Sequence, residues 1–215
     1  MICGIDEAGR GPLAGPVCAA AVILNTKNFP FNILNDSKKL NNALRYKARL
    51  VILEKALFWG IGWASHTEID NINILQASLL AMKRAFFNML IKNAENKTFL
   101  LGEEIQVIVD GNFIPDLNNI DNLEKESFLF NDIMKKTAIS CKALVKADAQ
   151  IPEVMAASIL AKTERDSLMD EMALLYPQYG YEKHKGYPTK AHREAVLKYG
   201  ASPIQRLSFK VKEDC

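Results

Sequence analysis

Two apolar segments near the N-terminus, joined by a turn rich in glycine and proline, constrain the fold of this chain most strongly. Residues 1–6 and 17–24 are apolar enough to form strands in the middle of a sheet. The connecting segment carries two carboxylates and an arginine between glycines: Asp6, Glu7, Gly9, Arg10 and Gly11. Charged groups are therefore expected where two central strands meet.

These residue types suggest phosphoryl chemistry. Asp and Glu offer hard oxygen ligands, which suit Mg²⁺ or Mn²⁺ better than zinc. Glycines on both sides of Arg10 allow backbone N–H groups to approach a ligand closely. The forked guanidinium of Arg10 suits a phosphate group. An Asp-Glu pair taken alone is usually a solvated turn, so the flanking residues carry this interpretation.

The adjacency of Asp6 and Glu7 sets a geometric condition. Neighbouring residues on a regular strand point to opposite faces of the sheet. The two side chains can share a site only if the strand ends or bends there, or if Glu7 also uses its backbone carbonyl. Gly9 and Gly11 would permit such a bend.

The rest of the chain alternates between predicted strands and helices, which indicates an α/β fold. Further strands are predicted at residues 56–64, 105–109 and 137–145. Helices are predicted from Asn41 or Asn42 to about Lys55, from Asp70 or Asn73 onward, at 152–175 and at 190–199. Residues 115–136 suggest a loop followed by a short helix, and 176–189 a structured loop. We expect one domain over 1–215, in which residues from about 176 form a C-terminal helical part.

Two helical patterns concern the core and possible basic surfaces. Apolar residues recur at intervals of four, three, four and four, which indicates a stripe on one buried helix face. These residues are Leu75, Leu79, Met82, Phe86 and Leu90. Lys83 and Arg84 lie off this stripe and are predicted to face solvent or substrate. Lys162 and Arg165 are three residues apart and would present a basic edge, or only a solvated helix face.

Two further acids follow predicted strands. Asp110 ends a short buried strand and precedes Gly111-Asn112, a position well suited to metal binding. Asp148 comes just after the strand predicted at 137–145. A bare turn aspartate would be the simplest interpretation of Asp110, but its order after Asp6 and Glu7 favours a ligand.

Composition narrows the functional class only slightly. The chain has 215 residues, 49% of them hydrophobic, and a formal net charge of +2, too mild to demonstrate a nucleic-acid partner. The four cysteines form no CxxC pair, which argues against a disulfide framework or zinc site and fits a reducing cytoplasm. We expect no signal peptide and no apolar stretch of the ~20 residues that a membrane span requires.

Motifs in a fixed order resemble ribonuclease HII, the type 2 ribonuclease H family. The matching blocks run from residue 4 to about residue 209. They are the segments at 4–17, 34–40, 68–75, 109–112, 146–148, 151–162, 184–192 and 203–209. The chain departs from the family pattern in the long connection 115–136, in Ala147 where glycine is usual, and in Leu207 where a basic residue is usual.

The resemblance implies a ribonuclease H-like mixed sheet of about five strands flanked by helices. It also implies an endonuclease that hydrolyses the RNA strand of RNA–DNA hybrids and cuts 5′ of ribonucleotides embedded in duplex DNA. Two divalent ions, Mg²⁺ or Mn²⁺, would serve the reaction, which leaves 5′-phosphate and 3′-hydroxyl ends. The implied catalytic and metal-binding residues are Asp6, Glu7, Asp110 and Asp148. The implied substrate-binding residues are Gly9, Arg10, Gly11, Lys38, Lys39, Asn73, Lys162 and Tyr187.

The resemblance also implies that the backbone of residues 9–11 and the ring of Tyr187 recognise the ribonucleotide. Without the resemblance, Tyr187 would be a packing residue, and Lys38 and Lys39 a solvated pair. The resemblance further implies a cytoplasmic monomer active in DNA replication and ribonucleotide excision repair.

Two other functions remain open at this point. A non-catalytic module that binds hybrids would keep the lysines and Tyr187 but would not need four acids. A transposase- or resolvase-type nuclease would keep the acids but not the Gly-Arg-Gly and His-Lys-Gly-Tyr segments.

Overall fold

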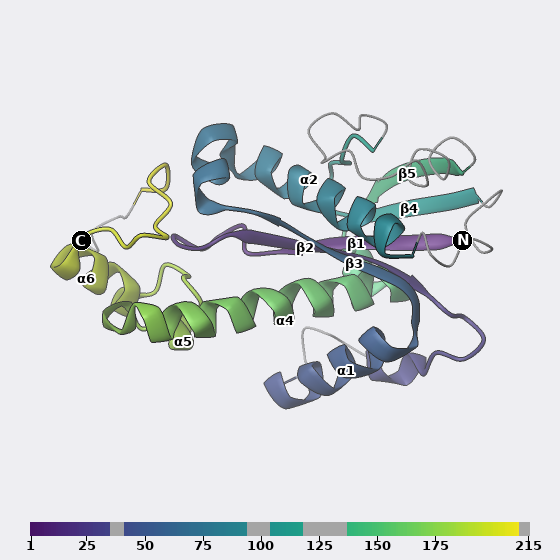
Figure 1. Ribbon diagram of the computed structural model, residues 1–215, viewed down its shortest axis with the longest axis horizontal. Coiled ribbons are helices and arrows are strands. Elements are labelled where there is room, and N and C mark those ends of the chain that lie inside the picture. The colour runs from purple at the N-terminus through teal and green to yellow at the C-terminus, as the bar shows by residue number, and fades with distance from the viewer. Residues whose placement is uncertain (35–40, 94–103, 118–136, 211–215) are drawn as a thin grey trace.

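A mixed five-stranded sheet forms the centre of the molecule (Figure 1). The computed structural model describes residues 1–34, 41–93, 104–117 and 137–210. The strands are β1 (Ile2–Ala8), β2 (Val17–Leu24), β3 (Ala56–Ala64), β4 (Glu104–Asp110) and β5 (Ala138–Leu144). Their order is β3-β2-β1-β4-β5, with antiparallel pairs on the β3 side of β1 and parallel pairs on the β5 side. The predicted α/β architecture is confirmed.

Helices cover both faces of the sheet. The α-helices are α1 (Asn42–Lys55), α2 (His66–Asn93), α4 (Pro152–Leu175), α5 (Tyr181–His184) and α6 (Lys190–Tyr199). Short 3₁₀ turns are η1 (Phe31–Leu34), η2 (Ala147–Ala149) and η3 (Pro177–Tyr179). Figure 1 shows α2 on one face of the sheet and α4 on the other, with α1 on the α4 side. The predicted helices 152–175 and 190–199 are confirmed at both ends.

The sequence of β2 is uniformly apolar because both of its faces are covered. Its odd-numbered residues, such as Val17 and Ile23, pack in the core that α2 shares. Its even-numbered residues, such as Cys18 and Val22, pack in the core formed with α1 and α4. Every residue of the strand is buried. A strand buried on two faces has no polar side to alternate with.

The stripe predicted along α2 forms part of its contact with the sheet. Met82, Phe86 and Leu90 are buried in the core, and Leu79 packs against it from a half-buried position. Leu75 is only half-buried. The stripe therefore begins to contact the sheet about one turn later than the periodicity predicts.

The start of α2 differs from the prediction. The helix begins at His66, earlier than Asp70 or Asn73, but its backbone is interrupted at Asn73, where φ is 66°. The carboxamide of Asn73 accepts hydrogen bonds from the backbone N–H of Leu75 (3.0 Å) and Gln76 (3.1 Å). Asn73 thus caps a second helical segment, in agreement with the predicted start there.

One expectation about apolar stretches is corrected. The segment His66–Lys92 of α2 is long and apolar enough, by length and composition, to cross a membrane. Half of its most apolar window is buried inside the molecule. Packing against the sheet accounts for this composition without a membrane.

The C-terminal part packs around the far end of α4. Met169 and Ala173 of α4 form a small core with Tyr179 and Tyr181, and Val196 of α6 packs against it. The segment 176–189, predicted as a structured loop, contains η3 and α5. Most of the loop and helix predicted for 115–136 lies outside the described residues.

Candidate active site

The parallel register of β1 and β4 brings two predicted acids to the same edge of the sheet. Ile5 pairs with Val109, so Asp6 and Asp110 follow side by side. The side chains of Ile5 and Val109 both pack in the core on the α2 face. Because side chains alternate along a strand, both acids point to the face that α4 covers.

Asp148 reaches the same place from the next strand. The chain leaves β5 and turns into η2, which carries Asp148. The backbone N–H of Ala147 in this turn donates a 2.7 Å hydrogen bond to Oδ1 of Asp110. One oxygen from each of three carboxylates, Asp6, Asp110 and Asp148, lies within 4.8 Å of the others. We call these three residues the acid cluster.

The electrostatics of the acid cluster suit a divalent cation. Asp6 and Asp148 are each only 6% exposed. Burial raises the pKa of Asp6, the negative charges of Glu7 and Asp110 raise it further, and a hydrogen bond with Ser158 opposes them in part. Carboxylates this close repel one another until a cation neutralises them. The all-oxygen donor set fits Mg²⁺ or Mn²⁺.

Glu7 stands outside the acid cluster. β1 continues regularly through Glu7, which pairs with Ala19, so the strand does not end or bend where the two side chains would need it to in order to share a site. The carboxylate of Glu7 accepts a 3.3 Å hydrogen bond from Arg10 Nη1. Burial raises the pKa of Glu7, and the Arg10 guanidinium opposes that effect. A metal-binding role for Glu7 stays a prediction.

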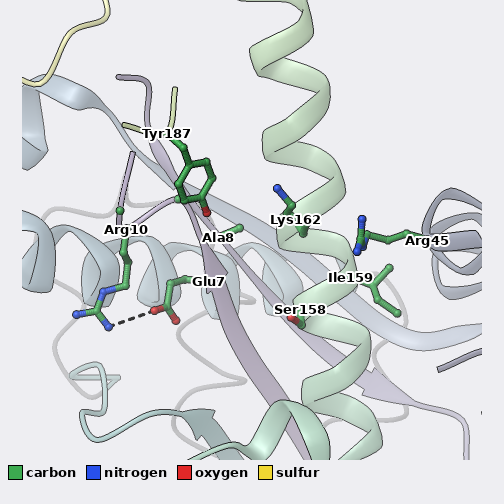
Figure 2. A pocket seen from close by; sticks show the side chains of 10 residues that line it. Glu7, Ala8, Arg10, Arg45, Ser158, Ile159, Lys162 and Tyr187 are labelled. Atoms are coloured by element: carbon green, nitrogen blue, oxygen red, sulfur yellow. Dashed lines mark hydrogen bonds and ion pairs between the residues drawn. The ribbon is translucent and has the colours of Figure 1, made fainter. Parts of the chain in front are cut away.

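A cavity of about 500 Å³ lies next to the acid cluster. Figure 2 shows side chains from β1, α4 and the C-terminal part converging on it. Its lining residues are Glu7, Ala8, Gly9, Arg10, Gly11, Arg45, Ser158, Ile159, Lys162 and Tyr187. The link to the acid cluster is Ser158, whose side chain is hydrogen-bonded to Asp6. Five of the predicted substrate-binding residues are therefore brought together.

The two glycines beside Arg10 have different structural reasons. Gly9 has φ +102°, and a Cβ there would lie 2.1 Å from Nε of Arg165. Gly11 has no positive φ, and a Cβ there would lie 3.6 Å from Cε1 of Tyr187, an ordinary contact. Gly9 is thus required by the fold, whereas Gly11 keeps free the space in front of the Tyr187 ring.

Two buried imidazoles support the turn that carries Tyr187. His184 and His192 stack with ring centroids 4.6 Å apart. Nδ1 of His184 accepts a hydrogen bond from the Gly186 N–H, and Nδ1–H of His192 donates to the Tyr187 carbonyl. Burial lowers the pKa of both imidazoles, which favours their neutral forms. Tyr187 itself is 40% exposed and lines the cavity.

The basic residues of the predicted helix faces behave differently from one another. Lys162 lines the cavity, with Nζ 2.7 Å from an oxygen of Asp166 and 5.8 Å from the centroid of the Tyr187 ring. Arg165 is only 1% exposed, so the predicted basic edge formed by the two residues is wrong. Arg84 donates hydrogen bonds to Glu68 and to the Trp63 carbonyl, which makes it a structural residue instead of one facing substrate.

Three predicted substrate contacts are not placed in the cavity. Lys38 and Lys39 lie outside the described residues. Asn73 is exposed and is not among the residues that line the cavity; its observed role is to cap α2. A substrate role for these three residues stays a prediction.

Sequence reasoning missed Arg45, Ser158 and the buried Arg206. Arg45 lies on α1 without any pattern that marks it, and Ser158 sits in an alanine-rich helix start that indicates packing. Arg206 belongs to a block singled out only for its motif, and nothing local indicates that it is completely buried.

Comparison with known proteins agrees with this geometry. The family model described as Ribonuclease HII matches residues 3–212. Ribonuclease HII of Treponema denticola is 53% identical over 218 residues, covering 99% of each chain. The ribonuclease H2 of Pyrococcus horikoshii OT3 has the same fold, with a TM-score of 0.65 at 24% identity over 98% of this chain and 94% of that one. The Mn²⁺ complex of Bst-RNase HIII gives a TM-score of 0.65 at 18% identity, over 97% and 66%.

Proposed function

The chain belongs to the ribonuclease HII family and is a ribonuclease H, and from that premise we propose that it cuts RNA–DNA hybrids and also duplex DNA that contains single ribonucleotides. Cleavage is proposed 5′ of the ribonucleotide, leaving 5′-phosphate and 3′-hydroxyl ends. The observation that carries the proposal is the shared cavity: the Gly-Arg-Gly segment and Tyr187 line it, and Ser158 connects it to the acid cluster.

The acid cluster is the proposed site of metal binding. Asp6, Asp110 and Asp148 would hold divalent cations, with Glu7 at the margin as a further ligand. The oxygen donors and the raised pKa of the buried Asp6 support this assignment, and Bst-RNase HIII is known with Mn²⁺. Two such ions would activate water and stabilise the leaving oxygen of an in-line displacement.

The chain's own groups would orient the substrate. The Arg10 guanidinium lies 3.3 Å from Glu7 and remains about half exposed, so it can also contact a phosphate. Lys162 adds a second cation on the opposite wall of the cavity (Figure 2). These groups would hold the backbone of the strand that is cut while the acid cluster serves the reacting phosphate.

Recognition of RNA requires a reader of the 2′-hydroxyl, the group that distinguishes RNA from DNA. We assign this role to the backbone of residues 9–11 together with the Tyr187 ring. Tyr187 is partly exposed and lines the cavity, and an aromatic ring can stack on a sugar or base. Gly11 adds no side chain between the loop and the ring, which leaves room for a ribose.

The proposal extends to the cellular setting: a cytoplasmic monomer that serves DNA replication and ribonucleotide excision repair. Cys3, Cys18 and Cys141 are free thiols, which fits a reducing compartment.

The test is a cleavage assay on a DNA duplex that contains one ribonucleotide, run with Mg²⁺, with Mn²⁺ and with chelator. A uniform RNA–DNA hybrid and an all-DNA duplex serve as companion substrates. Metal-dependent cutting on the 5′ side of the ribonucleotide, and no cutting of the all-DNA duplex, is the expected result. Cutting of the hybrid alone would overturn the assigned roles of residues 9–11 and Tyr187. Binding without cleavage in either metal would indicate a hybrid-binding module instead.

A further inference from the structure

Arg206 lies behind the loop that lines the cavity and is completely buried. We call residues 9–16 the reading loop. The Arg206 guanidinium donates five hydrogen bonds to carbonyl oxygens of this loop. The acceptors are Gly9 (2.6 Å), Arg10 (3.1 Å), Pro12 (2.8 Å), Gly15 (2.8 Å) and Pro16 (3.2 Å). One side chain, about 190 residues distant in sequence, thus holds five carbonyls of the loop.

A second buried arginine connects the reading loop to the Tyr187 turn. Arg165 donates to the carbonyls of Ala14 (3.1 Å), Pro16 (2.9 Å) and Lys185 (3.0 Å). In the described part of the chain, no carboxylate forms an ion pair with Arg165 or Arg206. Burying two unpaired guanidinium groups is costly, and the carbonyl dipoles offset that cost. Burial lowers the pKa of Arg206 to about 9, and the charge of Arg165 contributes.

The hydrogen bonds of Arg206 have a geometric consequence for the cavity side of the loop. In a trans peptide the C=O and the following N–H point in opposite directions, and the chain has no cis peptide bonds in its described part. The carbonyls of Gly9 and Arg10 point inward to Arg206. The N–H groups of Arg10 and Gly11 must therefore point outward.

These two N–H groups are available to a ligand. Within the described residues, neither the Arg10 nor the Gly11 N–H donates a hydrogen bond to the backbone of a turn or loop or to a side chain. Both residues line the cavity. Adjacent outward N–H groups can donate hydrogen bonds to an oxygen atom of a ligand, such as a hydroxyl or a phosphate oxygen.

The C-terminal segment holds Arg206 in place. The backbone N–H of Arg206 donates a hydrogen bond to the Leu13 carbonyl (2.8 Å). The carboxylate of Asp70 on α2 accepts hydrogen bonds from the N–H groups of Leu207 and Ser208, both at 2.9 Å. The centroid of the Phe209 ring lies 5.1 Å from the guanidinium carbon of Arg206. Asp70 and Phe209 thus fix the residues immediately after Arg206.

We propose that Arg206 is a positioning residue for recognition of the ribonucleotide: its hydrogen bonds aim the N–H groups of Arg10 and Gly11 at the substrate. This inference rests on the proposed function. It assigns part of the enzyme's specificity for the ribonucleotide to a buried side chain that touches no substrate. A purely structural arginine would instead lower stability and affect all substrates alike.

The experiment compares kcat/KM on two substrates, a DNA duplex with one ribonucleotide and a uniform RNA–DNA hybrid. For Arg206→Met we expect a loss of about a hundredfold on the single ribonucleotide, the scale of a misplaced binding group. We expect a loss of no more than about fivefold on the hybrid, where every nucleotide of one strand offers a 2′-hydroxyl. The fraction of cuts displaced from the ribonucleotide should also rise.

Two further variants separate positioning from stability. The quantity compared is the ratio of kcat/KM on the single-ribonucleotide duplex to kcat/KM on the hybrid. Arg206→Lys keeps the charge but has three donors for five carbonyls, so it should restore this ratio only in part. Arg84→Met is the matched control, because Arg84 also anchors a backbone carbonyl but lies away from the cavity. It should lower the melting temperature without changing the ratio.

If Arg206→Met does not fold, Asp70→Asn provides the second test, because it weakens the anchor of Leu207 and Ser208 and leaves the guanidinium intact. It should shift the ratio in the same direction by about threefold to tenfold, as expected for weakening charged hydrogen bonds. Equal losses on both substrates in the Arg206 and Asp70 variants would overturn the inference alone. A wild-type protein that cuts neither substrate would overturn the proposed function and this inference together.

Discussion

The acid cluster and the reading loop face the same region but are built in opposite ways. The acid cluster concentrates like negative charges at strand ends, and its members come from β1, β4 and the turn after β5. The reading loop has no regular structure, and two buried cations hold its carbonyls from behind. The acid cluster is proposed to bind cations from solution, whereas the guanidinium groups behind the reading loop belong to the chain itself.

This difference teaches where each region is sensitive to change. The geometry of the acid cluster comes from sheet register, so the loss of one charge should change its chemistry and leave the fold intact. The geometry of the reading loop comes from backbone hydrogen bonds and left-handed φ angles. A change there should alter both local structure and recognition, and the proportion of the two effects should depend on the position.

The largest predicted effect is at Asp110, which tests the first half of the comparison. Asp110→Asn should reduce cleavage of every substrate by at least about a thousandfold, since it removes one metal-binding charge. The carboxamide oxygen can still accept the hydrogen bond from Ala147 N–H, so the melting temperature should change little. Cleavage rate and thermal unfolding are measured on the same preparation.

Glu104→Gln is the matched control for Asp110→Asn. Glu104 lies on the same strand, at its other end, and is exposed. Its substitution also removes one negative charge, and activity should stay within about twofold of wild type, as for most surface changes. Near-normal cleavage by Asp110→Asn would contradict the assignment of the acid cluster.

Two alanine substitutions, at Gly9 and Gly11, sharpen the second half of the comparison. Gly9→Ala should destabilise the protein by about 1–3 kcal/mol or more, because the φ of +102° is strained for alanine and Cβ would meet Arg165. Gly11→Ala should leave the free energy of unfolding nearly unchanged. It should still reduce cleavage beside a single ribonucleotide by about tenfold to a hundredfold, since its methyl group occupies space next to Tyr187.

This prediction is tested by urea denaturation and by cleavage beside a single ribonucleotide, both measured for the two glycine variants. Alanine at a third glycine, Gly200, is not a suitable control because its φ is also positive, at +81°. Equal destabilisation by the two substitutions would show that Gly11, like Gly9, is required by the fold. If Gly11→Ala cleaved normally beside a single ribonucleotide, the proposal that this glycine leaves room for a ribose would be wrong.

The smallest predicted effect concerns pH and metal. Since the folded-state pKa of Asp6 and Glu7 is raised, the metal-free fold binds protons more tightly than the unfolded chain does. Their contribution to stability is therefore fully present below the ordinary carboxyl pKa of about 4 and is lost as pH rises through the raised values. Mn²⁺ should raise the melting temperature by a few degrees at pH 8, and by less at pH 5.5, where protons compete for the same oxygens.

Differential scanning fluorimetry with and without Mn²⁺ at the two pH values measures this shift. Asp110→Asn should reduce the shift at pH 8, since one ligand charge is lost. A shift of equal size at both pH values would indicate that the ion binds elsewhere. A shift that is larger at pH 5.5 would contradict the direction of the raised pKa values.

Local sequence patterns determined much of this molecule by themselves. Apolar runs predicted the five strands, most clearly β2, because a strand buried on both faces must be apolar throughout. Helical periodicity identified the core face of α2, and Pro152 marked the start of α4. The ordered motifs indicated the family, since they lie at short, local spacings. Asp110 could be named because it ends a strand, Asp6 because it stands beside Glu7 ahead of the Gly-Arg-Gly turn, and Asp148 through the family resemblance.

Only the tertiary structure decided which of these groups meet. The parallel register of β1 and β4 placed Asp6 beside Asp110, and strand alternation left Glu7 outside the acid cluster. Arg165 and Arg206 carry no local sign of burial, because most of their acceptors are carbonyls about 150 and 190 residues away in sequence. Local pattern reports which face of an element is apolar. Contacts between distant backbone groups, which any residue type can offer, arise only when the chain folds.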